Sequence, residues 1–353
     1  MTSIEYVAKQ AHFMTDDTAA WALFERAPSV RFAGVDDAGR PVLRTLSAVV
    51  LDGALCFHGT DHGEKLGLID REVIASHDEV MAQIPSYWIH PELACPASTY
   101  YASALAEGRV ERIDDLAHKA RILTALMQRY QPEGGYDEIR PEDKRYAKVL
   151  ERLLVAELRP RNVSAKLKLG QHRTLSQITR VLEGLWRRGG PGDVRALRSI
   201  LEAHPARPEP AFLSGPEGST LCVSPDREDA RQVAAMLVGQ YWTEGFTLER
   251  MANAQLGSAA WVVARDRDTR AVLASARGVS DVARFGYVLD VIVRPDLRGR
   301  GYGYAVTERL LDHPAMRDLR AIGLRTRDAH GLYRKFGFAN VDHQNTTMGL
   351  SRV

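Results

Sequence analysis

Residues 285–311 constrain the fold more than any other part of the chain. An apolar run, Phe285–Val293, is followed by the glycine-rich residues 298–303 and then by a helical pattern over Tyr302–Leu311. The run is apolar enough to predict a central strand buried on both faces. Glycines let successive backbone N–H groups point into one concavity, and a helix N-terminus adds partial positive charge. The segment therefore predicts a strand, an anion-binding loop and a helix.

Two common phosphate-binding loops do not match residues 298–303. No Lys-Ser or Lys-Thr pair ends the loop, as a P-loop requires, and no glycine at the sixth position completes a dinucleotide-binding fingerprint. Taken alone, the loop leaves a purely structural turn as an alternative to an anion site.

The chain is long enough for two domains. Its 353 residues exceed what one hydrophobic core usually organises. Proline and glycine gather over residues 187–218, interrupted by one helical pattern at 194–203, and this composition indicates a linker. We predict a first domain over residues 1–209 and a second over residues 210–353, with the boundary near Pro210.

Composition and charge favour an ordinary globular protein. Hydrophobic residues make up 45% of the chain and charged residues 26%. A net charge of +2 is too small to indicate nucleic-acid binding. The three cysteines, Cys56, Cys95 and Cys222, form no CxxC pair, so neither a disulfide framework nor a zinc site is expected. Residues 1–11 lack the apolar run of a signal peptide or membrane span, and we expect a cytoplasmic protein.

The first domain begins with short β-rich runs joined by tight turns, which favours an antiparallel meander as in a small barrel. Helical and strand patterns follow along both domains, and the fold class predicted is α+β. The expected strands are 30–35, 41–51, 54–58, 154–158, 260–264, 271–279 and Phe285–Val293, and the expected helices are 116–130, 141–153, 194–203, 227–241 and 302–311.

Two motifs of the second domain resemble one known superfamily. Residues 298–303 have the form R-x-x-G-x-G, and residues 324–338 read LRTRDAHGLYRKFGF, which contains an LYxxxGF segment. With YVLDVIV at 287–293, these motifs resemble the GNAT superfamily of N-acetyltransferases over residues 223–348. The resemblance implies a GNAT mixed α/β domain that transfers an acetyl group from acetyl-CoA to an amine.

The resemblance also implies roles for individual residues. Main-chain groups of Val291 and Val293 would pair with the pantetheine arm of CoA where neighbouring strands separate, and Tyr333 would be the general acid for the CoA thiolate. That Tyr333 only packs in the core is the alternative. The residues expected to hold the pyrophosphate are Arg298, Gly299, Arg300, Gly301, Tyr302 and Gly303.

The amine must lose a proton before it attacks a thioester, so a base is expected. Asp290 on the central strand is the first candidate. Strand alternation would put Asp290 and Ile292 on one face of the sheet. Asp328 and His330 are alternatives, and either of them could instead cap the short helix that starts there. The acceptor is expected at residues 240–251, near Tyr241, Trp242 and Phe246, a segment that does not name the amine.

The first domain resembles a second family. Residues 53–59 and 63–66 resemble the YFHxxxxGxK region of the FMN-binding split-barrel superfamily, close to its nitroimidazole-resistance-like and pyridoxamine-phosphate-oxidase-related branches. Residues 95–103, 108–110 and 166–173 resemble further segments of the same proteins. The resemblance covers residues 13–189 and implies an antiparallel split β-barrel with helices that binds FMN across a homodimer interface.

The FMN site implied by this resemblance draws on both ends of the domain. Lys65 would contact the phosphate, although a solvated surface lysine is the alternative. Haem is an alternative cofactor, with His58, His90 or His172 as axial ligand, and no metal site is expected. The residues assigned to FMN are His58, Gly63, Lys65, Tyr100, Ser103, Lys168 and Gln171, of which the last two would come from a neighbouring subunit.

The two resemblances together suggest a bifunctional enzyme. An N-acyltransferase acting on a small amine would be fused to a flavin-dependent oxidoreductase domain. In an alternative hypothesis, the split-barrel domain is a flavin- or haem-binding sensor or a dimerisation module. A third, in which the acetyltransferase domain only binds acyl-CoA, is disfavoured because the glycine loop and Tyr333 are both present. We expect no nucleic-acid or membrane partner.

Overall fold

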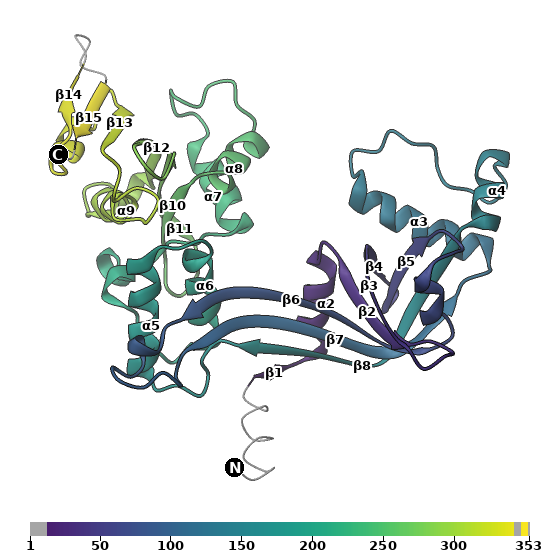
Figure 1. Cartoon of the computed structure of the whole chain (residues 1–353). Coiled ribbons are helices and arrows are strands. Elements are labelled where there is room, and N and C mark those ends of the chain that lie inside the picture. Colours follow the sequence, from purple (N-terminus) through teal and green to yellow (C-terminus); the bar gives the residue numbers. More distant parts are fainter. Residues whose placement is uncertain (1–12, 342–346, 352–353) are drawn as a thin grey trace. The chain divides into compact units, whose positions relative to one another are not determined.

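The protein is described from a computed structural model, which covers residues 13–341 and 347–351. The chain forms two compact units (Figure 1). The first unit comprises Met1–Gln83 and Thr99–His172, and the second comprises Ile84–Ser98 and Arg173–Val353. The units divide at a different place from the boundary predicted near Pro210, because residues 173–209 cluster with the second unit. Helices and strands occur in both, which confirms the α+β class.

The first unit contains an eight-stranded sheet. Neighbouring strands follow the order β3-β2-β6-β7-β8-β5-β4, and β1 also pairs with β8. The strands are β1 (Met14–Thr15), β2 (Val30–Val35), β3 (Pro41–Leu46), β4 (Ala48–Leu51), β5 (Ala54–Gly59), β6 (Glu72–Ile84), β7 (Ser98–Arg112) and β8 (Leu154–Lys168). The single strand predicted at 41–51 was wrong: the chain breaks at Ser47, and β3 and β4 lie at opposite ends of the strand order.

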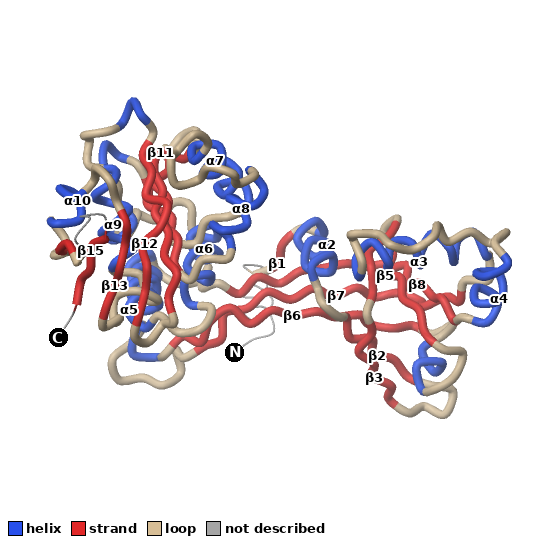
Figure 2. The backbone as a smooth tube through the Cα atoms, turned by 90° about the horizontal axis from the view of Figure 1, so that it is seen from above, coloured by secondary structure: helices blue, strands red, loops and turns tan. Residues whose placement is uncertain are grey.

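Strands β6, β7 and β8 are much longer than the others and run side by side (Figure 2). Sequence patterns predicted only residues 154–158 of β8. Its remaining residues are rich in Lys, Arg and Asn, and such polar residues lower a strand prediction although they suit a half-exposed sheet. Register is continuous between Tyr101 and Glu107 of β7 and the facing residues of β8, and one irregularity follows at Gly108.

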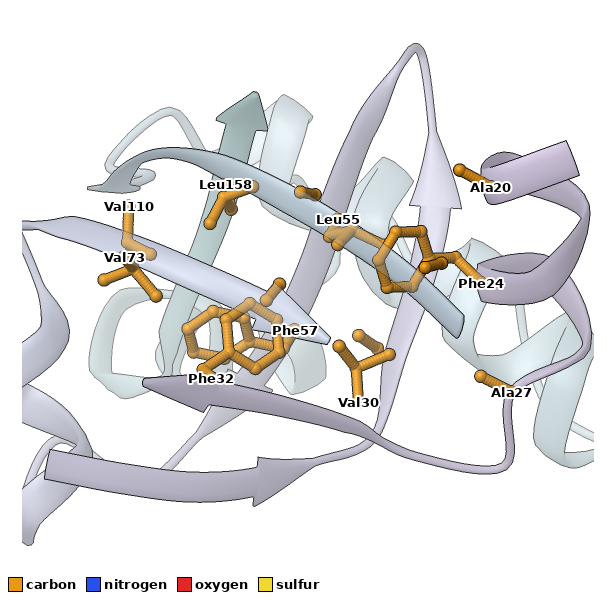
Figure 3. Packing of buried hydrophobic residues seen from close by; sticks show 14 of the residues in the cluster. Ala20, Phe24, Ala27, Val30, Phe32, Leu55, Phe57, Val73, Val110 and Leu158 are labelled. Carbon is orange, nitrogen blue, oxygen red and sulfur yellow. The ribbon is translucent and has the colours of Figure 1, made fainter. Parts of the chain in front are cut away.

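The core of the first unit packs a helix against the sheet. Helix α2 (Asp17–Arg26) begins at the N-cap Asp16, whose side chain accepts a hydrogen bond from the N–H of Ala19. It buries Phe24, while Phe32 from β2 and Phe57 from β5 meet with ring centroids 5.0 Å apart (Figure 3). Burying such aromatic side chains contributes about 1.5–3 kcal/mol each.

Helix α3 (Leu116–Tyr130) covers a second, smaller core of the first unit, and α4 (Lys144–Arg152) packs against α3. Helix α3 has the predicted bounds, and α4 starts three residues later than predicted, because Asp143 caps it. The cap of α3 is Asp115. The apolar side of α3 supplies Ile122 and Leu126 to this core.

The second unit is built on a seven-stranded mixed sheet. The order is β14-β15-β13-β12-β11-β10-β9, and β12 lies in the middle as predicted. The strands are β9 (Thr220–Cys222), β10 (Ala260–Arg265), β11 (Val272–Ser280), β12 (Phe285–Val293), β13 (Ala321–Arg325), β14 (Ala339–Asn340) and β15 (Thr347–Ser351). Helices α7 (Arg227–Leu237) and α8 (Leu248–Leu256) pack with the apolar cluster that contains Ile292, whereas Gly303 of α9 (Tyr302–Leu311) lies against Val293.

Helices α5 (Leu175–Arg188) and α6 (Asp193–Ala203) explain why the second unit starts so early. Trp186 at the end of α5 donates from Nε1 to Asp312, 2.9 Å away, and stacks on Phe212 with ring centroids 5.2 Å apart. The β6–β7 hairpin tip belongs to the same unit, and a Cβ at Gly184 would lie 2.5 Å from the Trp88 ring. The segment interpreted as a linker is therefore largely packed structure.

The remaining helical elements are short. Helix α10 spans His330–Arg334, and 3-10 turns occupy η1 (Glu64–Leu68), η2 (Ser86–Trp88), η3 (Ala211–Leu213), η4 (Pro216–Gly218) and η5 (Pro295–Leu297). Within residues 13–341 and 347–351, no helix combines the length and the apolar character that crossing a membrane requires.

Candidate functional site

The second unit contains a cavity of about 680 Å³. Four parts of the chain form it: β11, which supplies Arg277, β12, the segment from the end of α7 through α8, and the segment from β13 to α10. The residues that line it are Tyr241, Trp242, Thr243, Phe246, Arg250, Met251, Ala254, Arg277, Tyr287, Val288, Leu289, Asp290, Val291, Arg325, Thr326, Arg327, Asp328, Ala329 and Tyr333.

The cavity opens where two strands separate. Strands β12 and β13 pair in parallel only over Phe285–Tyr287 and Ala321–Gly323. The second half of β12 therefore has no partner on that side. The prediction that β12 is buried on both faces was wrong: only Val288 and Ile292 are buried, because β12 lines the open cavity and has no β13 partner beyond Tyr287.

A bulge in β12 places Asp290 at the cavity wall. Ser275 pairs with Ile292 and Arg277 pairs with Leu289, so β12 has one extra residue here. Asp290 has φ of 49°, in the left-handed region that Asp tolerates better than most residues. Such a conformation costs on the order of 1 kcal/mol and is typical of functional sites.

Asp290 is held by two donors. Its Oδ2 accepts from Nε of Arg277 at 2.6 Å and from Nε2 of Gln255 at 3.3 Å. Gln255 lies on α8, so the Asp290 carboxylate points toward the helices against which Ile292 packs. The carboxylate is thus neutralised by a guanidinium that is itself almost buried.

Tyr333 also lines the cavity, from α10. Its side chain is only 6% exposed and packs edge-on against Phe338, with ring centroids 6.0 Å apart. Burial, followed by the charges of Tyr241 and Asp328, raises the pKa of the Tyr333 phenol above its ordinary value of 10.0. A phenol in this environment stays protonated at neutral pH and is able to donate its proton.

Neither Asp328 nor His330 caps helix α10, the role that was their alternative to acting as a base. Helix α10 has Ala329 at its N-cap, and Oγ1 of Thr326 accepts from the Ala329 N–H at 3.0 Å. Asp328 therefore does not cap the helix. Its exposed side chain lines the cavity instead, whereas His330 is absent from the lining residues.

The glycine-rich loop follows β12 directly. Gly299 and Gly301 have φ of 80° and 88°, so both need the left-handed conformation that glycine adopts freely. Gly301 is also the N-cap of α9, and no side chain caps that helix. The first N–H groups of α9 thus have no side-chain acceptor, whereas Arg298 and Arg300 of the predicted set donate their N–H groups to the Pro295 and Leu297 carbonyls.

Tyr241, Trp242 and Phe246, expected near the acceptor, all line the cavity. Helix α7 ends at Leu237, four residues before the predicted end, because Oγ1 of Thr243 donates to the Leu237 carbonyl at 2.6 Å and turns the chain. Sequence reasoning missed four arginines of the same cavity, Arg250, Arg277, Arg325 and Arg327. Arg325 and Arg327 lie in the quoted segment 324–338, but the sequence does not show that Arg250 of α8 and Arg277 of β11 join them at one cavity.

In the first unit, one group of the expected cofactor residues lies at the end of β5. Lys65 Nζ donates to Oγ1 of Thr60 at 3.1 Å and to the His62 carbonyl at 2.5 Å. The lysine stem lies over Gly59, where a Cβ would come within 2.6 Å of it. Burial lowers the pKa of His58, and its buried Nδ1 finds no partner within the described residues.

The other group lies at the far end of β8. His58 pairs with Val155, whereas Tyr101 pairs with Lys168. Lys168 is 13 residues beyond Val155 on β8, which is roughly 40 Å along the strand at about 3.3 Å per residue. Gln171 uses its amide locally, donating to the Leu167 carbonyl at 2.6 Å. One chain therefore does not bring the seven expected residues into one site.

Tyr100 and Ser103 also separate. They are three residues apart on β7, and the register shows no bulge between Tyr101 and Ala106, so their side chains lie on opposite faces of the sheet. Tyr100 is buried with the core, and Ser103 is opposite Lys166 on the other face. They cannot both face one flavin ring within this chain.

Two family models match the chain. One, described as pyridoxamine 5'-phosphate oxidase, matches residues 16–167, and the other, described as an acetyltransferase (GNAT) domain, matches residues 257–340. The chain joins a pyridoxamine 5'-phosphate oxidase-like domain to a GNAT acetyltransferase domain. We call these the oxidase-like domain and the GNAT domain. No curated protein matches the sequence.

Solved structures resemble each domain separately. The oxidase-like domain is similar to an FAD and haem binding protein from Mycobacterium smegmatis. The two are 24% identical, the match covers 44% of this chain and 72% of that chain, and the TM-score is 0.37. The same domain is also similar to a flavocytochrome from Azotobacter vinelandii, at 19% identity, 49% and 72% coverage and a TM-score of 0.38. A GNAT-family protein from Xanthomonas campestris pv. campestris shares 31% identity over 34% of this chain and 84% of that chain, with a TM-score of 0.30. At these TM-scores, the assignment depends on the family models.

Proposed function

We propose that the GNAT domain transfers an acetyl group from acetyl-CoA to a small amine. The observation that carries this proposal is Tyr333, a buried phenol in the wall of a cavity that opens where β12 and β13 separate. The uncapped start of α9, at Tyr302 and Gly303 after the turn made by Gly299 and Gly301, would bind the pyrophosphate of CoA.

The pantetheine arm would enter between the two separated strands and pair with main-chain groups of Val291 and Val293. The amine nitrogen then attacks the thioester carbonyl, so a C–N bond forms and the C–S bond breaks. Tyr333 gives its proton to the departing CoA thiolate and recovers one from solvent. The raised pKa of Tyr333 keeps this proton in place until the thiolate forms.

The attacking nitrogen must lose its own proton, and we propose Asp328 rather than Asp290 as the group that takes it. Asp290 was the first candidate, but its Oδ2 is engaged by Arg277 and Gln255. Asp328 lies in the cavity, its charge acts on Tyr333, and it forms no ion pair within the described residues. Because Asp328 is exposed, it can return the proton to water.

Calorimetric titration with acetyl-CoA tests the donor site. Gly301→Val places a β-branched residue at φ of 88°, which should distort the loop and weaken acetyl-CoA binding roughly tenfold or more. Gly331→Ala is the matched control, because a Cβ there meets nothing within 4 Å and φ is ordinary. Equal affinity of the Gly301→Val variant and the wild type would contradict the loop assignment.

For the oxidase-like domain, we propose a flavin-binding role with oxidoreductase activity. The Thr60 hydroxyl and the Lys65 ammonium meet in a loop bounded by Gly59 and Gly63, a donor set that suits a phosphate. The unpartnered Nδ1 of buried His58 offers one further polar atom. When bound, FMN would supply hydride or electron transfer, and haem with a histidine ligand is the alternative cofactor.

A sensor or dimerisation role is the second candidate for the oxidase-like domain. It is supported by the distance between Lys65 and Lys168, which prevents one chain from forming the whole expected flavin site. If the two groups belong to one site, a second copy of the chain must supply one of them, which is why we propose a homodimer. The absorbance spectrum of the purified protein decides the cofactor: flavin bands support FMN, a Soret band supports haem, and a featureless spectrum contradicts both.

A further inference from the structure

The cavity of the GNAT domain carries more positive than negative charge. Its lining includes four arginines and two aspartates, all named above. One arginine, Arg277, is neutralised by Asp290, with 2.6 Å between Nε and Oδ2. Arg250, Arg325 and Arg327 remain, opposed only by Asp328. A bound ligand would therefore meet a positive field at the acceptor end.

Two of these arginines are held in place by aromatic rings. The Arg327 guanidinium lies 3.9 Å above the centre of the Tyr241 ring, and the Arg327 backbone N–H donates to the Tyr241 hydroxyl at 3.3 Å. Arg250 lies 5.5 Å from the centre of the Phe246 ring. Stacking fixes a guanidinium by its face and leaves the N–H groups at its edge for a planar anion.

Neither stacked arginine has a carboxylate partner. Within the part of the chain that the structure describes, no ion pair involves Arg250, Arg325 or Arg327. Arg265, a buried arginine of the same unit, pairs with Asp229, whereas Arg250, Arg325 and Arg327 are exposed toward the cavity. The donors in the cavity are therefore positioned but unused.

We propose that the acceptor amine also carries a carboxylate, which Arg327 and Arg250 bind, while its apolar part lies against Tyr241, Trp242 and Phe246. An amino acid with an apolar side chain has this chemistry. The inference rests on the acyl transfer proposed above and adds the class of acceptor. A carboxylate suits these arginines, because the two planar groups can pair through two parallel N–H···O hydrogen bonds.

The same charges also assist the reaction. Positive groups close to an ammonium favour its neutral form, which is the nucleophile. The carboxylate holds the molecule in the cavity, the neutral amine forms the C–N bond, and its released proton passes to Asp328 or water. Tyr333 protonates the thiolate as before, so protons balance over the cycle.

A panel of paired amines tests the class of acceptor. The twenty common amino acids would be assayed with acetyl-CoA, each as the free acid and as its carboxamide, by release of the CoA thiol and by product mass. We expect free acids with apolar side chains to show a kcat/KM at least tenfold above that of their amides. Equal or faster reaction of the amides, or no reaction of any free acid, would overturn the proposal.

A phosphate is the other anion that arginines bind. Phosphoethanolamine and ethanolamine form the corresponding pair, and a preference for phosphoethanolamine without reaction of any amino acid would also overturn the carboxylate assignment. Raising the salt concentration should raise KM for the free acids more than for the amides, because exposed charge pairs are screened.

Variants separate this proposal from the acyl transfer itself. Arg327→Gln and Arg250→Gln should each raise KM for the best free acid roughly tenfold or more, with little effect on its amide or on acetyl-CoA affinity. Arg231→Gln is the matched control, since Arg231 is exposed on α7 and pairs with Glu228 outside the cavity. Weaker acetyl-CoA binding in the Arg327 and Arg250 variants would assign these cations to CoA and overturn the proposal. Absence of acetyl-CoA binding in the wild type would instead refute the acyl transfer.

Discussion

The two domains assemble their candidate residues in different ways. In the GNAT domain, residues from Tyr241 to Tyr333 surround one cavity. In the oxidase-like domain, the expected residues divide into a group at Lys65 and a group at Lys168, at opposite ends of the long strand pairing. The same kind of evidence, a motif resemblance, therefore led to one converging site and one divided site.

The difference follows from the length of chain over which each motif acts. A strand, a glycine loop and a helix that follow one another have little freedom, because the glycines at 299 and 301 set the turn and α9 starts at once. Residues on β7 and β8 are placed by the pairing of two strands of 15 residues each. Short motifs do not reveal which residues of the two strands pair. Local motifs thus fix local geometry, while long sheets separate residues that a motif list groups together.

Replacing Tyr333 with Phe should produce the largest effect. It removes one oxygen from a buried ring and leaves the packing against Phe338 intact. We expect kcat to fall roughly 10²–10⁴-fold, the usual contribution of a general acid, with the acetyl-CoA dissociation constant unchanged. Steady-state kinetics combined with calorimetry would show whether the converging site is catalytic. A variant as fast as the wild type would leave Tyr333 a packing residue.

The pH profile sharpens the same test. Because the pKa of Tyr333 is raised, its phenol is protonated below that value and the acid form persists through the alkaline range. The wild-type rate should therefore show no loss from this group up to about pH 10, its ordinary pKa. A descending limb below pH 9 that disappears in Tyr333→Phe would contradict this picture.

The two aspartates of the cavity should behave differently. Asp328→Asn removes the group we propose as proton acceptor, and kcat should fall by roughly 10²-fold with little change in stability. Asp290→Asn leaves Arg277 without its carboxylate, so unfolding should become easier by about 1.5–3 kcal/mol while most activity remains. Activity assays and chemical denaturation of both variants decide whether Asp328 or Asp290 is the base. The opposite pattern would return the base to Asp290.

The sequence predicted some elements closely and others poorly, for physical reasons. The bounds of β12, α3 and α9 agree with the prediction because each has a clear apolar pattern and a defined start. The break at Ser47 was missed because apolar residues continue on both sides of it, and only tertiary pairing sends β3 and β4 to different strands.

Site residues followed the same division. Tyr333 and the glycines at 299 and 301 lie in local motifs and could be named from the sequence. Arg327 lies in the same segment as Tyr333, but its stacking on Tyr241, 86 residues away, could not be predicted, because no pattern links the two. Asp328 and His330 were alternatives for the base, with capping of α10 as their other possible role, and neither caps that helix, since Thr326 accepts the Ala329 N–H.

Mixing variants of the oxidase-like domain tests whether its divided residues form one site across two chains. Lys65→Gln should weaken flavin retention roughly 10–100-fold, the range for a charge-assisted hydrogen bond, and Lys168→Gln should do so if Lys168 faces the same flavin. Flavin content would be measured from absorbance after co-refolding or co-expression of the two variants. Partial recovery in the mixture indicates a shared site, since one of the two sites is then intact.

Two other outcomes are informative. If flavin is lost in the Lys65→Gln variant but not in Lys168→Gln, the phosphate contact lies within one chain and Lys168 is not part of the site. Unaltered flavin content in both variants would show that neither lysine binds the phosphate, and the comparison between a converging and a divided site would no longer apply. Arg161→Gln serves as the control, because Arg161 is an exposed residue of β8 that pairs with Glu72.

The domains should also differ in how strongly they respond to acid, because burial lowers the pKa of His313 in the second unit further than that of His58 in the first. His313 of the second unit is 5% exposed, its Nδ1 accepts from the Ala315 N–H at 3.1 Å, and it packs edge-on against Trp186. Burial, reinforced by the charge of Arg317, lowers its pKa from 6.5 to about 4. Between these values the unfolded chain binds a proton that the folded chain does not. Stability is therefore complete above pH 6.5 and falls as the pH drops toward 4, by up to about 1.4 kcal/mol per pH unit.

Hydrogen exchange of peptides from each unit would detect this difference. Protection in α5 and in residues 312–317 should decline between pH 6.5 and 4 after correction for the intrinsic exchange rate, and His313→Gln should flatten the decline. Because Trp186 ties α5 to this histidine, both segments should respond together. If α5 kept its protection while residues 312–317 lost theirs, α5 would not be an integral part of the second unit, and the unit would begin later in the chain, nearer to Pro210.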